Sequence, residues 1–440
     1  MTLFGKVKII KTLALSKLVY FLINIPRPPD NIMQEVNRLC FNFLWDYKPS
    51  KIKKEMIIKN YKHGGMSMID LNNYNKSLKI SWMKRALLDD KYSTCINLSE
   101  NDCKIILNTG GYIKAEIMKK LNPFWLEVAQ SWNEFLCKLE RPAEIRHILS
   151  QSVWNNPFFK NKECFNNRWY NLGIRKICDI THTNGEIKSF REMKIEFNID
   201  DNFLLYNTIV VNIPKEWKDI MKNEGNNFDF NGQISYVKQI LETSAKNGSR
   251  FFYDCLICNN EEPRGHVKWA KHFSNSTIPW NRYHELNKNT IPDTKTRSFQ
   301  YKIYHHILPT NSILHKFGIK DSDKCTFCKE EKETIEHVIV NCSFSKHFWI
   351  DFESFISNKL NRSVEFSNIE KLFGALDENK TINHILTLAR KHIYYCKQKG
   401  LKPNMNDFNQ YLQKTIKLEL LSAQISQTPR SEKEKWKLFI

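Results

Sequence analysis

Residues Asp321 to Trp349 read DSDKCTFCKEEKETIEHVIVNCSFSKHFW, and the fold of the chain is best approached from this stretch. Four of its side chains, Cys325, Cys328, His337 and Cys342, follow the spacing C-x2-C-x8-H-x4-C. Three thiolates and one imidazole suit a tetrahedral Zn²⁺, and the two-residue gap lets the first two cysteines bind from one tight turn. Because protein ligands fill all four positions, we expect one structural zinc site with no place for a catalytic water.

The local structure around these ligands can also be predicted. A helix over 333–340 would present His337, with Cys342 just past its end, and Trp349 would cover the small metal-bound unit. Zinc binding would then supply local folding energy on the order of 10 kcal/mol at neutral pH. The alternative is a coincidence of unrelated residues, because the chain has 12 Cys and 13 His.

Charge argues against a segment that grips phosphate by itself. Residues 321–350 hold four Lys and no Arg against six acidic residues, a net charge of −2. A phosphate-binding segment would be basic. We therefore interpret the zinc segment first as a folded structural unit and only second as a reader of nucleic acid.

The composition of the whole chain favours a polyanionic partner. Its 440 residues suggest two to four structural units, and 41% hydrophobic residues are ample for buried cores, which excludes wholesale disorder. The net charge is +20. Nucleic acid is favoured over a membrane surface because the sequence has no lipidation motif.

Cysteine usage and the N-terminal residues bear on location. The cysteines are dispersed, which fits a reducing compartment. Residues 1–25 mimic a secretory signal, but Lys17 interrupts the apolar run, no small-x-small cleavage site follows, and Pro26 ends the segment. No apolar run approaches the ~20 residues that span a bilayer. We expect an intracellular protein of the cytoplasm or nucleus, in a ribonucleoprotein.

Basic residues concentrate at the two ends of the sequence. Residues 1–90 hold sixteen basic and seven acidic residues, and 380–440 hold twelve against four. Apolar periodicity predicts a helix over 3–24, a second helix that Asp30 or Asn31 can cap and that Trp45 ends, and a later helix that ends at Gly400. The recurring tryptophans between these ends are expected to be core residues rather than base-stacking platforms: Trp125, Trp132, Trp154, Trp169 and Trp217.

Several stretches, in order along the chain, resemble the C-terminal part of LINE-type (non-LTR) retrotransposon reverse transcriptases. They are LFGKVKIIKTLALSKLVYFLINIP, FLWDYKPSKIKKEMI, GGMSMIDLNNYNKSLKISWMKR, IPKEWKDIM, TKTRSFQYKIYHHILPTN, the zinc stretch and the tail around 388–400. The zinc stretch itself resembles the CCHC zinc-binding segment of those polyproteins.

The resemblance implies a mainly α fold (α with minor β), a multi-part helical chain with a small structural zinc unit. It divides the sequence into a thumb-like helical domain (1–90), a helical connector with short strands (91–320), the CCHC zinc-binding segment (321–350) and a C-terminal basic helical region (351–440).

In that family the palm, with an aromatic-x-Asp-Asp motif that holds two Mg²⁺, precedes the thumb. Asp89-Asp90 has no aromatic residue two positions ahead, and in FNIDDNF the aromatic before Asp200-Asp201 is one residue out of place. We therefore assign no catalytic residue. The chain is expected to be related to RNA-directed DNA polymerases and inactive in isolation, with the upstream polymerase domains as partners in a longer polyprotein.

The function implied by the resemblance is a grip on template RNA and target DNA through sequence-independent backbone contacts. The candidate phosphate-binding residues are five lysines of the basic N-terminal part: Lys6, Lys17, Lys51, Lys53 and Lys54. Two alternatives stay open: a non-catalytic adaptor or assembly protein derived from a retroelement, and a truncated frame with no selected role. An independent zinc nuclease is disfavoured because the sequence offers no open metal site.

Two further histidine patterns are interpreted as packing. Cys255-x2-Cys258 with His266 and His272 could be written as a second zinc site, but these cysteines lie in an apolar amphipathic run and act as small hydrophobic residues. His305-His306, at the end of a predicted helix, is also expected to pack rather than bind metal.

Overall fold

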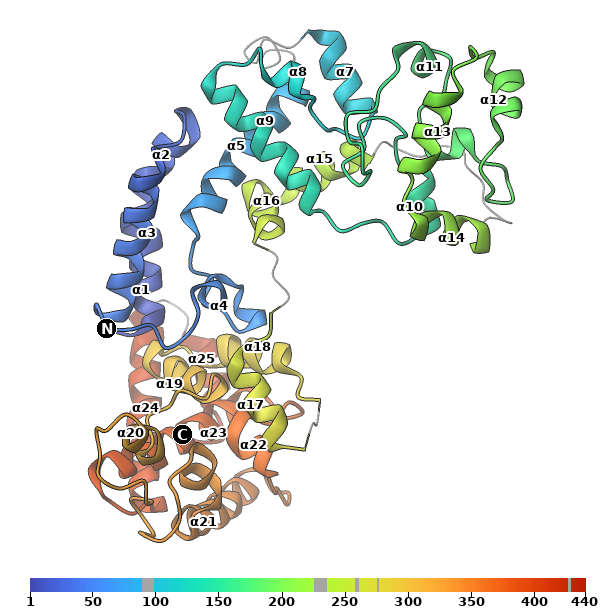
Figure 1. Cartoon of the computed structure of the whole chain (residues 1–440). Coiled ribbons are helices and arrows are strands. Elements are labelled where there is room, and N and C mark those ends of the chain that lie inside the picture. The colour runs from blue at the N-terminus through green and yellow to red at the C-terminus, as the bar shows by residue number, and fades with distance from the viewer. Residues whose placement is uncertain (89–98, 225–235, 258–260, 275–276, 426–428) are drawn as a thin grey trace. The chain divides into compact units, whose positions relative to one another are not determined.

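Helices make up nearly all of the regular structure of this chain. The computed structural model describes residues 1–88, 99–224, 236–257, 261–274, 277–425 and 429–440. Within these residues β-structure is limited to isolated antiparallel bridges, of which Lys324 with Lys332 lies in the zinc segment. Figure 1 shows the helices. The predicted mainly α fold with minor β is confirmed.

Contacts divide the chain into two compact units. Unit 1 comprises 1–13, 39–68 and 259–440, and unit 2 comprises 14–38 and 69–258. The division falls inside the π-helical turn η1 (Ile10–Leu15) and inside α3 (Asp30–Trp45). The four segments expected from the resemblance remain a prediction.

Unit 1 contains the zinc segment, the basic C-terminal region 380–440 and nine of the sixteen basic residues of 1–90. Its remaining helices are α1 (Leu3–Ile9), α4 (Lys54–Ile58), η2 (Tyr61–His63), α17 (Arg264–His272), α18 (Trp280–Thr290), α19 (Thr294–Tyr304), α20 (Asn311–Lys316), η6 (His337–Asn341), α21 (Ser343–Leu360), α22 (Asn368–Phe373), α23 (Lys380–Lys399), α24 (Met405–Ile425) and α25 (Pro429–Trp436).

Unit 2 is built from shorter helices joined by loops. They are α2 (Ser16–Asn24), α5 (Leu71–Leu88), α7 (Glu100–Asn108), α8 (Ala115–Met118), α9 (Pro123–Lys138), α10 (Ile145–Leu149), α11 (Asn167–Asn171), η4 (Ile177–Ile180), α12 (Phe190–Phe197), α13 (Phe203–Asn212), α14 (Lys215–Glu224), α15 (Tyr236–Asn247) and α16 (Ser249–Leu256).

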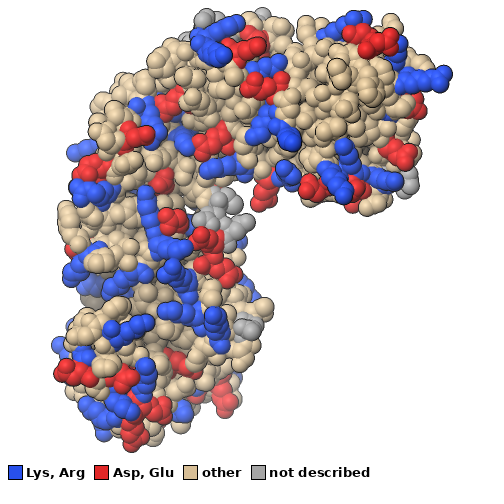
Figure 2. Space-filling model, viewed as in Figure 1, with Lys and Arg blue, Asp and Glu red and all other residues tan. Residues whose placement is uncertain are grey.

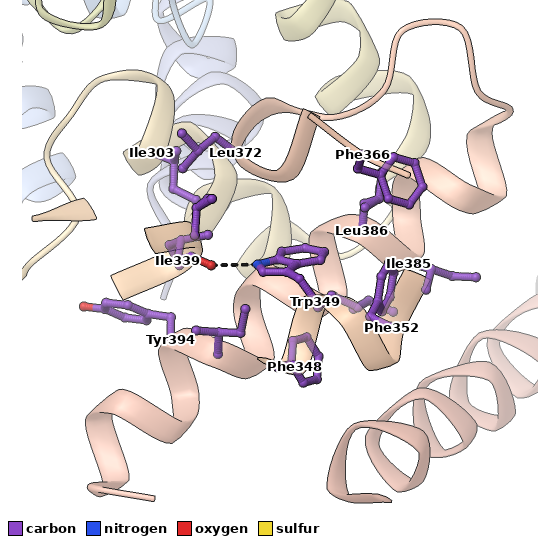
Figure 3. Packing of buried hydrophobic residues seen from close by; sticks show 14 of the residues in the cluster. Ile303, Ile339, Phe348, Trp349, Phe352, Phe366, Leu372, Ile385, Leu386 and Tyr394 are labelled. Carbon is purple, nitrogen blue, oxygen red and sulfur yellow. Dashed lines mark hydrogen bonds between the residues drawn. The ribbon is translucent and has the colours of Figure 1, made fainter. Parts of the chain in front are cut away.

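The core of unit 1 lies between α21 and α23. Trp349 and Phe352 of α21 pack in a cluster of buried apolar side chains with Ile385 and Leu386 of α23 (Figure 3). Helix α23 begins where the Asn379 side chain accepts a hydrogen bond from the amide of Ile382. It ends at Gly400, whose positive φ of 69° favours glycine, so the predicted helix end is confirmed.

The core of unit 2 has two clusters, one of which joins α5, α9 and α16 and one of which surrounds the segment after α10. The five tryptophans expected to be core residues are all buried. Four of the five indole N–H groups donate to an acceptor, as Trp132 does to the Gly111 carbonyl (2.8 Å) and Trp217 to the Pro142 carbonyl (2.9 Å). Buried indoles need such partners, which makes them core residues with fixed orientation.

Among the described residues, no helix has both the length and the apolar character that crossing a membrane requires.

Candidate functional site

Cys325 and Cys328 lie on a tight turn closed by a two-residue β-bridge. The Cys325 amide donates to the Glu331 carbonyl (2.8 Å), and the Lys329 amide donates to the Cys325 carbonyl (3.0 Å). Lys329 follows the second cysteine with a left-handed φ of 66°. This reversal turns both thiols to the same side, as the two-residue gap predicted.

His337 and Cys342 lie at the two ends of a single π-helical turn, η6. The helix predicted over 333–340 is present at 335–341, with Cys342 just past its end, and most of it is the π turn. The His337 amide donates to Thr334 Oγ1 (3.0 Å), and the Cys342 amide reaches back five residues to the His337 carbonyl (2.7 Å). The wider π turn places the imidazole and the thiol at the same point, which an α-helical turn four residues long would not do.

The four predicted ligands meet at one point. All four ligand atoms lie within 4.8 Å of one another. Cys325 Sγ is 3.8 Å from Cys342 Sγ, and Cys328 Sγ is 3.5 Å from His337 Nε2. Tetrahedral zinc with Zn–S bonds of about 2.3 Å and a Zn–N bond of about 2.0 Å separates two sulfurs by about 3.8 Å and a sulfur from a nitrogen by about 3.5 Å. The donor set and its spacing fit a single structural Zn²⁺, bound through Nε2 of the histidine.

Neighbouring groups prepare these ligands for a metal. The Cys325 thiol donates to Cys342 Sγ (3.8 Å), and this hydrogen bond lowers the pKa of the Cys342 thiol and raises the pKa of the Cys325 thiol. The Phe327 amide donates to Cys325 Sγ (3.4 Å), and a carboxylate oxygen of Glu331 lies 3.0 Å from His337 Nδ1. A carboxylate at Nδ1 favours the tautomer whose Nε2 is free to bind zinc.

A buried carboxylate that the sequence did not single out holds the hairpin in place. Glu333 is fully buried, and one of its oxygens accepts from the Asn311 amide (2.7 Å). The other accepts from the amide and hydroxyl of Thr326, at 2.8 and 2.7 Å. The ammonium of Lys397, on α23, lies 3.3 Å away. Thr326, one of the two residues between the first two cysteines, is therefore linked to α23 through Glu333 and its buried charge pair with Lys397.

The sequence predicts that Trp349 covers the metal-bound unit. Instead it is buried in the core and supports the π turn η6 from that side. Its indole donates to the Ile339 carbonyl in η6 (2.7 Å), as the dashed line in Figure 3 shows. The Ser345 hydroxyl donates to the neighbouring Val338 carbonyl (2.7 Å). Two carbonyls of the π turn thus accept hydrogen bonds from side chains of α21, which tie α21 to the turn that carries the zinc ligands.

Nothing in the local sequence distinguishes Glu333 from its acidic neighbours. It lies in an acidic run with Glu330 and Glu331, both of which are exposed, and its role depends on partners 22 residues before it and 64 after it in the sequence. Thr326 and Thr334 are ordinary polar residues in sequence terms. Only their contacts with the hairpin distinguish them.

The five candidate lysines lie in different surroundings. Lys6 is only 4% exposed, and its ammonium lies 2.5 Å from Asp46 and 3.2 Å from the Leu44 carbonyl. Lys17 is exposed on α2 and belongs to unit 2, whereas Lys6 belongs to unit 1.

The three lysines near residue 50 also differ from one another. Lys53 pairs with Glu261 (3.0 Å), and Lys54 is half-buried with its ammonium 5.1 Å from the ring of Phe41. Lys51 is exposed, and no hydrogen bond or ion pair within the described residues reaches its ammonium. Phosphate binding by these lysines stays a prediction, with Lys51 the most available.

The other acidic and histidine patterns have structural partners. Asp200 accepts from the Trp169 indole (2.8 Å) and Asp201 pairs with Lys194, and neither belongs to a cluster of potential metal ligands among the described residues. Asp89 and Asp90 lie outside the described residues.

The second zinc pattern is not assembled among the residues described here, where the only cluster of potential metal ligands is the one at Cys325. His266 lies against the Trp280 ring at 4.1 Å and His272 pairs with Glu336, while Cys258 is outside the described residues. Burial lowers the pKa of His266 to about 3 and that of His305 to about 4, so both are neutral packing residues at pH 7.

Comparison with known families agrees with this geometry. A family model for zinc binding in reverse transcriptase matches residues 266–349, which include all four metal ligands and the packing tryptophans before and after them. No curated protein matches the chain. The match covers less than half of the sequence, and it supports the interpretation of this region as the C-terminal zinc-binding part of a retroelement reverse transcriptase.

Proposed function

We propose that this chain is the nucleic-acid-binding C-terminal part of a LINE-type retroelement reverse transcriptase. Its thumb-like and connector helices, stiffened by the zinc segment, would hold template RNA and target DNA while upstream domains copy and cut. The chain by itself would not polymerise nucleotides. Such a role belongs in a ribonucleoprotein of the cytoplasm or nucleus.

The observation that carries this proposal is the uneven distribution of charge. Unit 1 has 38 Lys and Arg against 22 Asp and Glu, a net charge of +16, whereas unit 2 has 29 against 25, a net charge of +4. Four-fifths of the excess charge therefore belongs to the unit that contains the zinc site. Figure 2 shows Lys and Arg side chains gathered over the region where α4, α18 and α19 are labelled in Figure 1.

The zinc segment supports this arrangement without supplying the charge. The net charge of the segment is −2, and one of its acidic residues, Glu333, accepts hydrogen bonds within the segment. A metal-stiffened support beside a basic surface fits backbone contacts that position a strand without reading its sequence. Lys51 is the predicted lysine best placed for such a contact, since its ammonium is exposed and unpaired within the described residues.

A salt titration tests the proposal. Binding of RNA and of primed DNA, followed by fluorescence anisotropy, should weaken steeply with rising salt, because each phosphate neutralised adds ~0.7 to ~0.9 to the slope of log K against log salt. Incubation with primed RNA, nucleotides and Mg²⁺ should give no extension. A flat salt response would overturn the binding proposal, and extension of the primer would overturn the non-catalytic one.

A second candidate is an adaptor or assembly protein, which the acidic zinc segment and one apolar surface favour. On α13 in unit 2, Phe203, Leu204 and Val211 are 55%, 78% and 66% exposed. Exposed apolar residues of this kind often mark protein contacts. Under this alternative, the chain should not bind nucleic acid even at low salt. Replacement of Leu204 and Val211 by Ser should instead change its self-association, measured by sedimentation.

A further inference from the structure

A cavity of about 480 Å³ in unit 1 combines a basic rim with an apolar floor. It lies between the start of α1, the segment after α3, α19 and the C-terminal half of α23. Five lysines line it, together with Asp46 as the one acidic lining residue: Lys6, Lys48, Lys51, Lys295 and Lys302. We call this feature the basic cavity.

The charges of the rim are not balanced by the protein. Asp46 pairs with Lys6, and the hydrogen bond from Lys6 lowers the pKa of the Asp46 carboxyl. For Lys51, Lys295 and Lys302, no hydrogen bond or ion pair to the ammonium occurs anywhere in the described part of the chain. Like charges held together without counter-charges attract an anion from solvent.

Two of these ammonium groups lie close enough to repel each other. The pKa of Lys302 is lowered, first by its burial and second by the charge of Lys51. Lys302 is half-buried on α19, and Lys51 is exposed on the segment that follows α3. A phosphate placed between them would remove this repulsion and stabilise the charged form of Lys302.

The floor of the cavity is apolar and rigid. Phe299 and Tyr394 are almost fully buried, and their ring centroids lie 5.6 Å apart. The Tyr394 hydroxyl donates to the Pro309 carbonyl (2.9 Å), to which Lys397 also donates (3.2 Å). Lys397 is the partner of Glu333 in the zinc segment, so the metal site and the floor are joined by one buried charge pair.

A basic rim above an aromatic floor distinguishes single strands from duplexes. Single strands can splay a base onto an apolar surface while their phosphates follow a basic groove, whereas a duplex keeps its bases stacked inside. The volume also falls within the ~300–1,000 Å³ typical of pockets that enclose a small organic group.

We infer that the basic cavity binds single-stranded nucleic acid, with phosphates on Lys51, Lys295 and Lys302 and one base directed toward Phe299 and Tyr394. This rests on the proposed function and deepens it, since it names the strand state and the site. RNA and DNA share the required chemistry, so the test includes both.

The test uses the full chain and three labelled probes of equal length: oligouridylate, oligothymidylate and a blunt duplex. The variant replaces Lys51, Lys295 and Lys302 by Gln. The matched control replaces Lys359, Lys414 and Lys417 by Gln, since these lysines are exposed, lie in the same unit and do not line the cavity. Both variants remove the same net charge. Thermal melts check that both fold.

The cavity variant should lower the slope of log K against log salt for single strands by about 2, because each of three phosphate contacts on a single strand contributes ~0.7. If wild type and variant bind equally at 1 M salt, the variant should then bind about 100-fold more weakly than the wild type at 0.1 M salt. The control should change the slope by less than half as much. An abasic single strand should bind the wild type more weakly than oligothymidylate.

Several outcomes would overturn the inference. One is equal loss in both variants, which would mean diffuse charge rather than a site. Others are a cavity variant that loses only duplex binding, or an abasic strand that binds as well as oligothymidylate. If the wild type binds single strands and duplexes but the cavity variant is unchanged, the inference fails while the proposed function stands. If the wild type binds none of the probes, the proposed function itself fails.

Discussion

The zinc segment (321–349) and the basic cavity lie in the same compact unit, but they differ in whether their charged groups have partners within the protein. In the zinc segment the ligands converge on one point, and the buried Glu333 has partners at both of its oxygens. In the cavity, Lys51 and Lys302 line the same hollow, and neither ammonium has a carboxylate partner within the described residues. A region whose polar groups are satisfied internally stabilises a fold, whereas one with unbalanced charge is arranged for a ligand.

The largest expected effect concerns the zinc segment, whose polar groups have partners within the protein. Cys328→Ser should abolish zinc binding and unfold the hairpin, with a loss of binding free energy on the order of 10 kcal/mol at neutral pH. Metal content by mass spectrometry and the thermal melt measure it. Cys137→Ser is the control, because Cys137 is exposed and away from the metal ligands. Unchanged zinc stoichiometry in Cys328→Ser would refute the assignment.

Removal of the charge on Glu333 should have the next largest effect. Glu333→Gln leaves the Lys397 ammonium buried without its partner, which costs about 3–5 kcal/mol of the free energy of unfolding. Urea denaturation of the zinc-loaded protein measures this. Glu330→Gln, at an exposed position of the same run, should have little effect. Equal stability of the two variants would mean that the hairpin does not depend on α23.

The hydrogen bond from α21 to the π turn should contribute less to the free energy of unfolding than the Glu333–Lys397 pair does. Trp349→Phe removes the hydrogen bond to the Ile339 carbonyl and leaves that acceptor unpaired, at a cost of about 1–3 kcal/mol. The zinc stoichiometry should stay at one, since no ligand changes. Ile350→Ala, at a residue 63% exposed on the same helix, is the control and should alter stability by less than ~0.5 kcal/mol.

The smallest expected effects on stability and on the salt slope distinguish Lys51, at the basic cavity, from the neighbouring Lys53. Lys53 has an exposed partner, Glu261, so Lys53→Gln should change stability by less than ~1 kcal/mol. Lys51→Gln should change stability as little but lower the salt slope for single-strand binding by ~0.7, whereas Lys53→Gln should lower it by less, because its ammonium is already engaged. Equal slopes would show that pairing in the free protein does not predict which lysine binds.

Much of the fold could be predicted from local patterns. The apolar stripe of the helix that ends at Trp45 and the glycine stop at Gly400 predicted helix ends that the structure confirms, because apolar stripes and C-terminal glycines act within one or two turns. The type of turn at His337 could not be predicted, since the choice of a π over an α turn depends on donors from Thr334 and Trp349.

The sequence alone determined the four metal ligands and the basic character of the chain, because ligand identity and spacing follow directly from the chemistry of zinc, and net charge is a sum over residues. Only the tertiary structure decided which charged groups are used internally and which remain free. Glu333 and Lys6 look like surface residues in the sequence yet are buried with partners, while Lys51 and Lys302, far apart in the chain, become neighbours. The reason is that pairing of charges depends on distance in space, which local sequence does not encode.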